Sequence, residues 1–263
     1  MTFERDKGYS FLDEELPLQE KVSPNDLVFT RIDRPLEFSS IFGDGKIKVA
    51  QLLQSAWEKG VSIEAVFEFE LFRSEVELAQ GYYSWVILDD DEAIKIFKMP
   101  GPEVQGDLDI EEFFRIQLTQ LEFQLAHGGK NGVLRVTKIF TNENFRVIVG
   151  FGMERIRASE NLGQYLKRGG KLTPKMISDL IGQLRNLYQE THFSHGDIVS
   201  KVIEKGKEMY YVNTRNILVV IDEENEMALK LIDHNPGGFF NHPLDSQLEE
   251  IEVLERYLQQ FLT

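Results

Sequence analysis

Residues 191–201 read THFSHGDIVSK and set His195, Gly196 and Asp197 side by side. A triplet of this kind can be a polar turn without chemistry. It can also hold the carboxylate that accepts a proton from, or orients, an attacking hydroxyl group. Phosphoryl transfer from ATP needs such a carboxylate, groups that bind the phosphates, and metal ions that neutralise their charge. The other two requirements can therefore be sought in the rest of the chain.

A tight hairpin with small side chains could cover the phosphates, and the stretch ELAQGYYSWVIL at 77–88 has this pattern. Gly81 stands at the expected turn, and the small residues Ala79 and Ser84 flank it. An ordinary hairpin with a glycine turn has the same pattern. The stretch alone therefore does not define a phosphate-binding loop.

A cation for the phosphates could come from the next expected strand, EAIKIFK at 92–98. Lys95 stands in the middle of it between apolar residues, where a buried ammonium group would need a partner. The alternative is that Lys95 points to the solvent by strand alternation. Glu122 is the expected partner, because it falls on the helical face of three apolar residues, Leu118, Leu121 and Leu125.

The elements that must position these residues follow from hydrophobic periodicity. Alternating or short apolar runs predict strands at 66–72, 75–80, 82–88, 93–98, 133–140, 146–151, 216–221 and 228–232. Helical periodicity predicts helices at 48–60, at 110–126, after Thr173 and from about Asp245. Thr173 before Pro174 is a good helix start, and Ser246 with Glu249 has the spacing of a capping box. The order predicts an α+β protein in two lobes.

Composition excludes several classes of protein. The 263 residues include 29 Lys plus Arg against 44 Asp plus Glu, a net charge of −15 that disfavours nucleic acid and anionic membrane surfaces. There is no cysteine, which excludes disulfides and thiolate chemistry, and the five histidines make a zinc site improbable. No apolar run is long enough to span a bilayer. We expect a cytoplasmic protein, or one delivered into a host cell as an effector.

Several stretches in the right order resemble the protein-kinase-like superfamily. They are LAQGYYSWV, AIKIFK, VIVGFGME, HGD, NILV and LIDHN, and the resemblance covers roughly residues 75–235. It implies a bilobal fold with a β-rich N-lobe and a helical C-lobe. Because only 30 residues follow Asp233, we expect a truncated C-lobe. The expected division is an extension with one helix at 1–62, an N-lobe at 63–154 and a reduced C-lobe at 155–263.

The resemblance also implies ATP and Mg²⁺ as cofactors and assigns a role to each matching residue. Asp197 would be the catalytic carboxylate, and Asn216 and Asp233 would hold the metal. Lys95 would hold the phosphates, paired with Glu122. The remaining nucleotide contacts would come from the phosphate loop and the hinge, at Ala79, Gly81, Ser84, Glu154 and Ile156.

The chain departs from the family pattern at several points. Asp197 and Asn216 are nineteen residues apart, whereas the family usually separates these two residues by a few, so the stretch between them would be an insertion. Asp-His-Asn at 233–235 replaces the usual Asp-Phe-Gly. The lysine that often follows the catalytic Asp is Val199 here, which leaves Lys201 or Lys205 as substitutes.

Three functions remain open. The first is a compact Ser/Thr protein kinase, with a protein substrate or an activating protein partner. The second is a small-molecule or lipid kinase, which His-Gly-Asp favours and the missing substrate domain disfavours. The third is a pseudokinase or scaffold, or a kinase-like enzyme with another transfer reaction. The presence of every polar residue that transfer requires argues against a silent scaffold.

Overall fold

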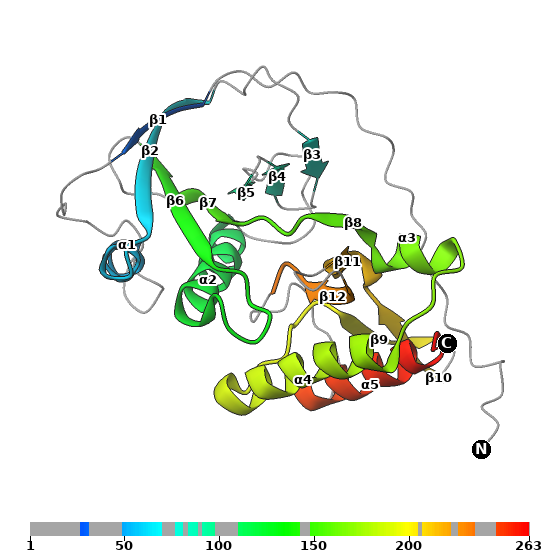
Figure 1. Ribbon diagram of the computed structural model, residues 1–263. Coiled ribbons are helices and arrows are strands. Elements are labelled where there is room, and N and C mark those ends of the chain that lie inside the picture. The colour runs from blue at the N-terminus through cyan, green and yellow to red at the C-terminus, as the bar shows by residue number, and fades with distance from the viewer. Residues whose placement is uncertain are drawn as a thin grey trace. The chain divides into compact units, whose positions relative to one another are not determined.

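The computed structural model describes residues 27–31, 49–69, 77–80, 84–88, 91–97, 110–142, 148–204, 207–221, 226–234 and 246–262 (Figure 1). Contacts divide the chain into two compact units. The described residues from 27 to 129 and from 134 to 156 form the N-terminal unit, and those at 130–133 and from 157 onward form the C-terminal unit. The chain thus changes unit after Ile156. The lobe boundaries expected from the sequence stay a prediction.

A seven-stranded mixed sheet forms the frame of the N-terminal unit, with strand order β1-β2-β6-β7-β5-β4-β3. β2 and β6 are parallel, and the other neighbouring strands are antiparallel. The strands are β1 (Leu27–Arg31), β2 (Ser62–Phe69), β3 (Glu77–Gln80), β4 (Ser84–Leu88), β5 (Glu92–Phe97), β6 (Val136–Asn142) and β7 (Ile148–Glu154). The strand expected at 66–72 begins earlier, because alternation already buries Ile63 and Ala65.

Among the described residues, two helices belong to the N-terminal unit, α1 (Val49–Glu58) and α2 (Ile110–His127). α1 buries Val49, Leu52, Leu53 and Ala56 and ends before Gly60, whose positive φ of 73° favours glycine. Both helices were predicted from their periodicity. β1 was not, although it pairs with β2, because its five residues carry no sustained pattern.

The C-terminal unit combines helices with two small sheets. Its helices are α3 (Leu162–Lys167), α4 (Pro174–Thr191) and α5 (Gln247–Gln259), and a 3₁₀ turn, η2, covers Thr214–Asn216. β9 (Val199–Glu204) and β10 (Lys207–Val212) form a two-stranded ribbon, and β12 (Met227–Leu231), β11 (Ile217–Ile221) and β8 (Ala158–Asn161) form a three-stranded sheet. The expected helical C-lobe is therefore mixed in its described part, because the insertion after Asp197 folds into strands.

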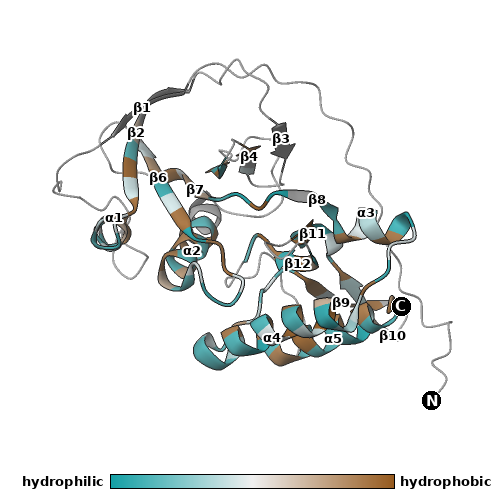
Figure 2. Ribbon diagram, in the orientation of Figure 1, coloured by the Kyte–Doolittle hydropathy of each residue, from teal (hydrophilic) through white to brown (hydrophobic). Residues whose placement is uncertain are grey.

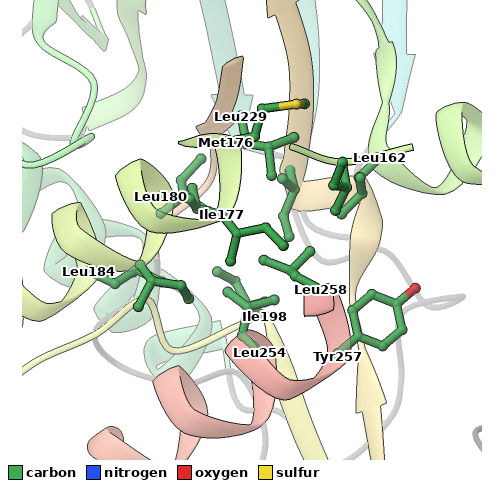
Figure 3. Close-up of a cluster of buried hydrophobic side chains, with 14 of the residues drawn as sticks. Leu162, Met176, Ile177, Leu180, Leu184, Ile198, Leu229, Leu254, Tyr257 and Leu258 are labelled. Carbon is green, nitrogen blue, oxygen red and sulfur yellow. The ribbon is translucent and has the colours of Figure 1, made fainter. Parts of the chain in front are cut away.

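The core of this unit lies where α4 and α5 meet the strands. Leu180 and Leu184 of α4 gather with Leu254 and Leu258 of α5 around Ile198 (Figure 3). Both helices carry polar and apolar residues in Figure 2, as amphipathic helices do. Among the described residues, no helix is long and apolar enough to cross a membrane.

Local signals correctly predicted the starts of α4 and α5. The Thr173 hydroxyl accepts a hydrogen bond from Met176 N, with Pro174 in the first turn. The Ser246 hydroxyl accepts one from Glu249 N at 3.1 Å. The reciprocal half of the expected capping box is wrong, because the Glu249 carboxylate instead contacts Tyr210 and Lys201 of the ribbon.

Candidate functional site

Asp197 and Asn216, nineteen residues apart, are in direct contact within the C-terminal unit. The Asn216 side-chain amide donates to Asp197 Oδ2 at 3.0 Å and to the Asp197 carbonyl oxygen at 3.3 Å. The Asn213 amide donates to the same carbonyl at 3.3 Å. Two asparagines thus hold both the backbone and the carboxylate of Asp197 in place.

Asp233 lies directly beyond the strand pair that Asn216 precedes. Ile217 pairs with Leu231, and Ile232 N donates to Asn216 O at 3.0 Å, which extends this ladder by one step. His195 Nε2 lies 2.7 Å from the carbonyl oxygen of the same Ile232. Backbone contacts at Ile232 therefore connect the stretch ending in Asp233 to Asn216 and to His195.

The chemistry of Asn216 and Asp233 fits a magnesium ion. The Asn216 nitrogen is used by Asp197, which leaves its side-chain oxygen as the atom that could bind a cation. Oxygen donors suit Mg²⁺, which typically takes one or two carboxylates from a protein and fills its shell with water and substrate phosphates. No cluster of three or more His, Cys, Asp or Glu that could hold a metal occurs among the described residues. Asn216 and Asp233 as ligands of a Mg²⁺ ion stay a prediction.

Gly196 has a conformational reason to be glycine. Its φ is 86°, in the left-handed region where a side chain would be strained. Its N–H donates to Glu250 Oε2 at 3.0 Å. The bend of the loop thus explains the glycine of the triplet.

Glu250 of α5 is a buried residue at the candidate site that sequence reasoning missed. Its side chain is almost fully buried, and its carboxylate accepts hydrogen bonds from the loop that carries Asp197. The donors are the Ser194 hydroxyl and the backbone N–H groups of His195 (3.0 Å), Gly196 (3.0 Å), Ile198 (2.9 Å) and Val199 (3.2 Å). Its spacing from Val253, Leu254 and Tyr257 places it on the buried stripe of α5, and this was the available signal.

The electrostatics of the loop favour an ionised Glu250. Burial alone would raise the pKa of this carboxyl. The attraction to the His195 ring when that ring is protonated and the hydrogen bonds from Gly196, Ser194 and His195 outweigh burial and lower the pKa. Glu250 is therefore an anion that the loop surrounds with donors.

His195 stacks against His234, with ring centroids 4.5 Å apart. Burial is the main cause that lowers the pKa of His195 below its ordinary value of 6.5. Burial, followed by the neighbouring His195, lowers the pKa of His234 well below that value. We therefore describe the two rings as a neutral pair in the interior of this unit.

We predict that acid destabilises the protein as the pH falls below about 6.5. The unfolded chain binds protons at its histidines in this range while the folded chain does not, so stability is present above 6.5 and declines below it. One pH unit below 6.5 the expected loss is about 1 kcal/mol per histidine. Urea unfolding across pH 5–8 measures it, and His234→Phe should flatten the decline. An unchanged decline in this variant would contradict the assignment.

In the N-terminal unit, Lys95 pairs with Gln120 and not with the predicted Glu122. Lys95 is 3% exposed on β5, and its Nζ donates to Gln120 Oε1 at 2.7 Å. Glu122 is exposed. α2 buries a wider face than expected, centred on Gln117, Leu121 and Gln124, and this turns Glu122 outward. The prediction that Lys95 is held by Glu122 is therefore corrected.

Replacing Gln120 and replacing Glu122 should have different consequences. Gln120→Leu removes a hydrogen bond to a buried ammonium group and should lower the free energy of unfolding by about 1.5–3 kcal/mol. Glu122→Leu changes an exposed side chain and should stay within about 0.5 kcal/mol of wild type. Chemical denaturation of both variants compares them directly. Equal effects would argue against the Lys95–Gln120 contact.

The other predicted nucleotide contacts are placed only in part. β3 and β4 form the expected hairpin, with Ala79 opposite Val86 and Ser84 buried, but Gly81 lies outside the described residues. Glu154 ends β7, and its Oε1 accepts a hydrogen bond from Arg135 N at 3.0 Å. Ile156 is half-buried. Their roles toward a nucleotide stay predictions.

Lys201 is bound within the ribbon. Its Nζ lies 3.0 Å from Glu208 Oε1 and 3.8 Å from Glu249 Oε1, and its side chain is 5% exposed. These contacts argue against Lys201 as a substitute for the lysine that kinases place after the catalytic Asp. Lys205, the other candidate, lies outside the described residues.

Comparison with known proteins gives structural likenesses alone. No family model matches the chain, and no curated protein matches it. Solved structures of WbdD, one of them titled a bifunctional kinase-methyltransferase, are similar to it. Monomeric WbdD shares 17% identity over 68% of this chain, with a TM-score of 0.43. The 2.2 Å structure of WbdD shares 16% sequence identity over 71% of this chain, with a TM-score of 0.41. The structure described as the bifunctional kinase-methyltransferase shares 18% identity over 59% of this chain, with a TM-score of 0.38. The matched region spans 30–38% of those chains, and a likeness of this strength does not establish a family.

Proposed function

We propose that the protein is an ATP- and Mg²⁺-dependent phosphotransferase, with a compact Ser/Thr protein kinase as the first candidate. The observation that carries the proposal is the contact of Asp197 with Asn216, next to the strand end that bears Asp233. Phosphoryl transfer uses a base near the acceptor hydroxyl, together with an amide and a carboxylate that bind the metal ion. The kinase-like order of the sequence motifs supports the same assignment.

Each residue has a defined role in the proposed reaction. Asn216 and Asp233 would hold Mg²⁺, which would neutralise charge on the transferred phosphates. Asp197 would orient the acceptor hydroxyl and take its proton. The Lys95 ammonium, held by Gln120, would bind phosphate oxygens of ATP. No covalent intermediate on the protein is required.

A protein acceptor is proposed in preference to a small molecule. The His-Gly-Asp triplet was the specific feature in favour of a small-molecule kinase, and the conformation of Gly196 now provides a separate reason for the glycine. The net charge of −15 fits an acceptor or activating partner with basic residues. A small molecule or lipid is therefore the second candidate, and a panel of acceptors distinguishes the two.

A silent scaffold is disfavoured by how the candidate residues are held. Asp197 is fixed by two asparagines, and its loop surrounds a buried carboxylate. Buried polar networks of this kind are costly unless every member is satisfied. Binding without turnover would not need Asp197 in a fixed position.

Transfer of label from ATP tests the proposal. The wild-type chain is incubated with Mg²⁺ and either γ- or α-labelled ATP, in separate reactions with basic peptides, whole proteins and small hydroxyl compounds. We expect γ-label on a peptide or protein and none without Mg²⁺. Label from the α-phosphate would redirect the assignment to AMP transfer, and label on small molecules alone would favour the second candidate. Nucleotide binding with no transfer to any acceptor would contradict the proposal.

A further inference from the structure

The β9–β10 ribbon connects directly to the residues that hold Asp197. β9 starts at Val199, two residues after Asp197, and β10 ends at Val212, directly before Asn213. Asn213 N donates to Ile198 O at 2.6 Å, and the Asn213 side chain donates to Asp197 O. A displacement of either strand would therefore move the backbone on both sides of the Asp197 loop.

Glu249 of α5 holds both strands of this ribbon. Tyr210 of β10 donates its hydroxyl to Glu249 Oε1 at 2.5 Å, and Lys201 of β9 places its Nζ 3.8 Å from the same oxygen. Lys201 and Tyr210 are direct cross-strand partners, so they lie on one face of the ribbon. One carboxylate thus contacts the two strands at the same level.

The surroundings of Glu249 make these contacts energetically significant. The Lys201 side chain is nearly buried, so its charge needs acidic partners, and one of these, Glu208, is more than half exposed. The hydrogen bond to Glu249, assisted by burial, raises the pKa of Tyr210, which keeps this hydroxyl a donor. Val199 belongs to the hydrophobic core, and Tyr210 and Val212 pack against it.

We infer that Glu249 is a positioning residue that fixes Asp197 through the ribbon. Two consecutive glutamates of α5 would act on successive segments, because Glu250 binds the loop at 194–199 and Glu249 holds the ribbon that continues it. The insertion that separates Asp197 from Asn216 would then be a brace for the loop. The consequence for catalysis rests on the proposed phosphotransferase function, whereas the consequence for loop order does not.

Hydrogen exchange measured by mass spectrometry tests the inference without an activity assay. The variants are Glu249→Gln and the milder Tyr210→Phe, and the matched control is Glu252→Gln, an exposed glutamate of the same helix. We expect the backbone amides of residues 195–204 to exchange about tenfold faster in the first two variants. The control should match wild type. Unchanged exchange of this segment in folded Tyr210→Phe and Glu249→Gln would overturn the inference.

Kinetics distinguish a positioning residue from a simple structural brace. In both variants the kcat should fall several-fold while the KM for ATP stays unchanged, because the proposed nucleotide contacts do not include Glu249. The double variant should be little worse than Glu249→Gln, since both substitutions remove one contact. Faster exchange with an unchanged kcat would overturn the catalytic part. If the wild type transfers no phosphate, the proposed function fails, and the exchange experiment still decides whether Glu249 orders the loop.

Discussion

Asp197→Asn is expected to reduce the rate of phosphoryl transfer by about 10²- to 10⁴-fold, the usual contribution of a positioned acid or base. Asparagine has nearly the same shape and can present its side-chain oxygen to the Asn216 amide, so the 3.0 Å contact can persist. What it loses is the ability to accept a proton from the acceptor hydroxyl. The affinity for Mg²⁺ and nucleotide should change little. Single-turnover transfer and nucleotide titration measure the two quantities.

Asp179→Asn is the matched control, because Asp179 is an exposed aspartate on α4 in the same unit. It should transfer phosphate at the wild-type rate. If Asp197→Asn also retained the wild-type rate, Asp197 would not be the catalytic carboxylate. Loss of nucleotide binding in that variant would instead indicate a role in metal binding.

Glu250→Ala should give the largest loss of stability among the substitutions considered, about 3–5 kcal/mol. It leaves several buried N–H groups of the loop without their acceptor, whereas the Ser194 hydroxyl keeps Gln247 Oε1 as an acceptor at 2.9 Å. Glu250→Gln should fall between wild type and Glu250→Ala, because a glutamine has one oxygen to offer where the glutamate offers two. Urea unfolding of both variants measures the effect, and loss of transfer should accompany it.

Glu252→Ala provides the comparison for Glu250, since Glu252 is exposed two residues later on α5. It should stay within about 0.5 kcal/mol of wild type. If Glu250→Ala were equally mild, the carboxylate would not be the anchor of the loop. The placement of His195 and Asp197 would then need another explanation.

The parts of the fold that local sequence determines were predicted well. α4 begins at Pro174 because Thr173 caps it, and its apolar stripe indicates which face of the helix is buried. The hairpin of β3 and β4 follows from two apolar runs around a glycine. The strand that begins directly after Asn216 was predicted from its apolar run, whereas the hydrogen bond between Asn216 and Asp197 was not predicted.

The parts that depend on distant partners were missed. The sequence of α5 does not indicate that the Glu250 carboxylate binds a loop more than fifty residues earlier in the chain. The ribbon at 199–212 mixes charged and apolar residues, and its buried Lys201 contacts Glu249, which comes from the distant helix α5. Gln120 was overlooked as a partner of Lys95, since a carboxylate two residues later was the more obvious choice. In each case, a residue distant in the sequence provides the partner of a buried polar side chain.

Binding of Mg²⁺ with a non-hydrolysable ATP analogue tests the central claim, that Asn216 and Asp233 hold the metal of a bound nucleotide. Calorimetric titration of wild type, Asn216→Ala, Asp233→Asn and the double variant forms a double-mutant cycle. Each single substitution should weaken binding, and we predict a coupling of about 1 kcal/mol or more between them. Losses that add to within about 0.5 kcal/mol, or a wild-type chain that binds no nucleotide, would contradict it.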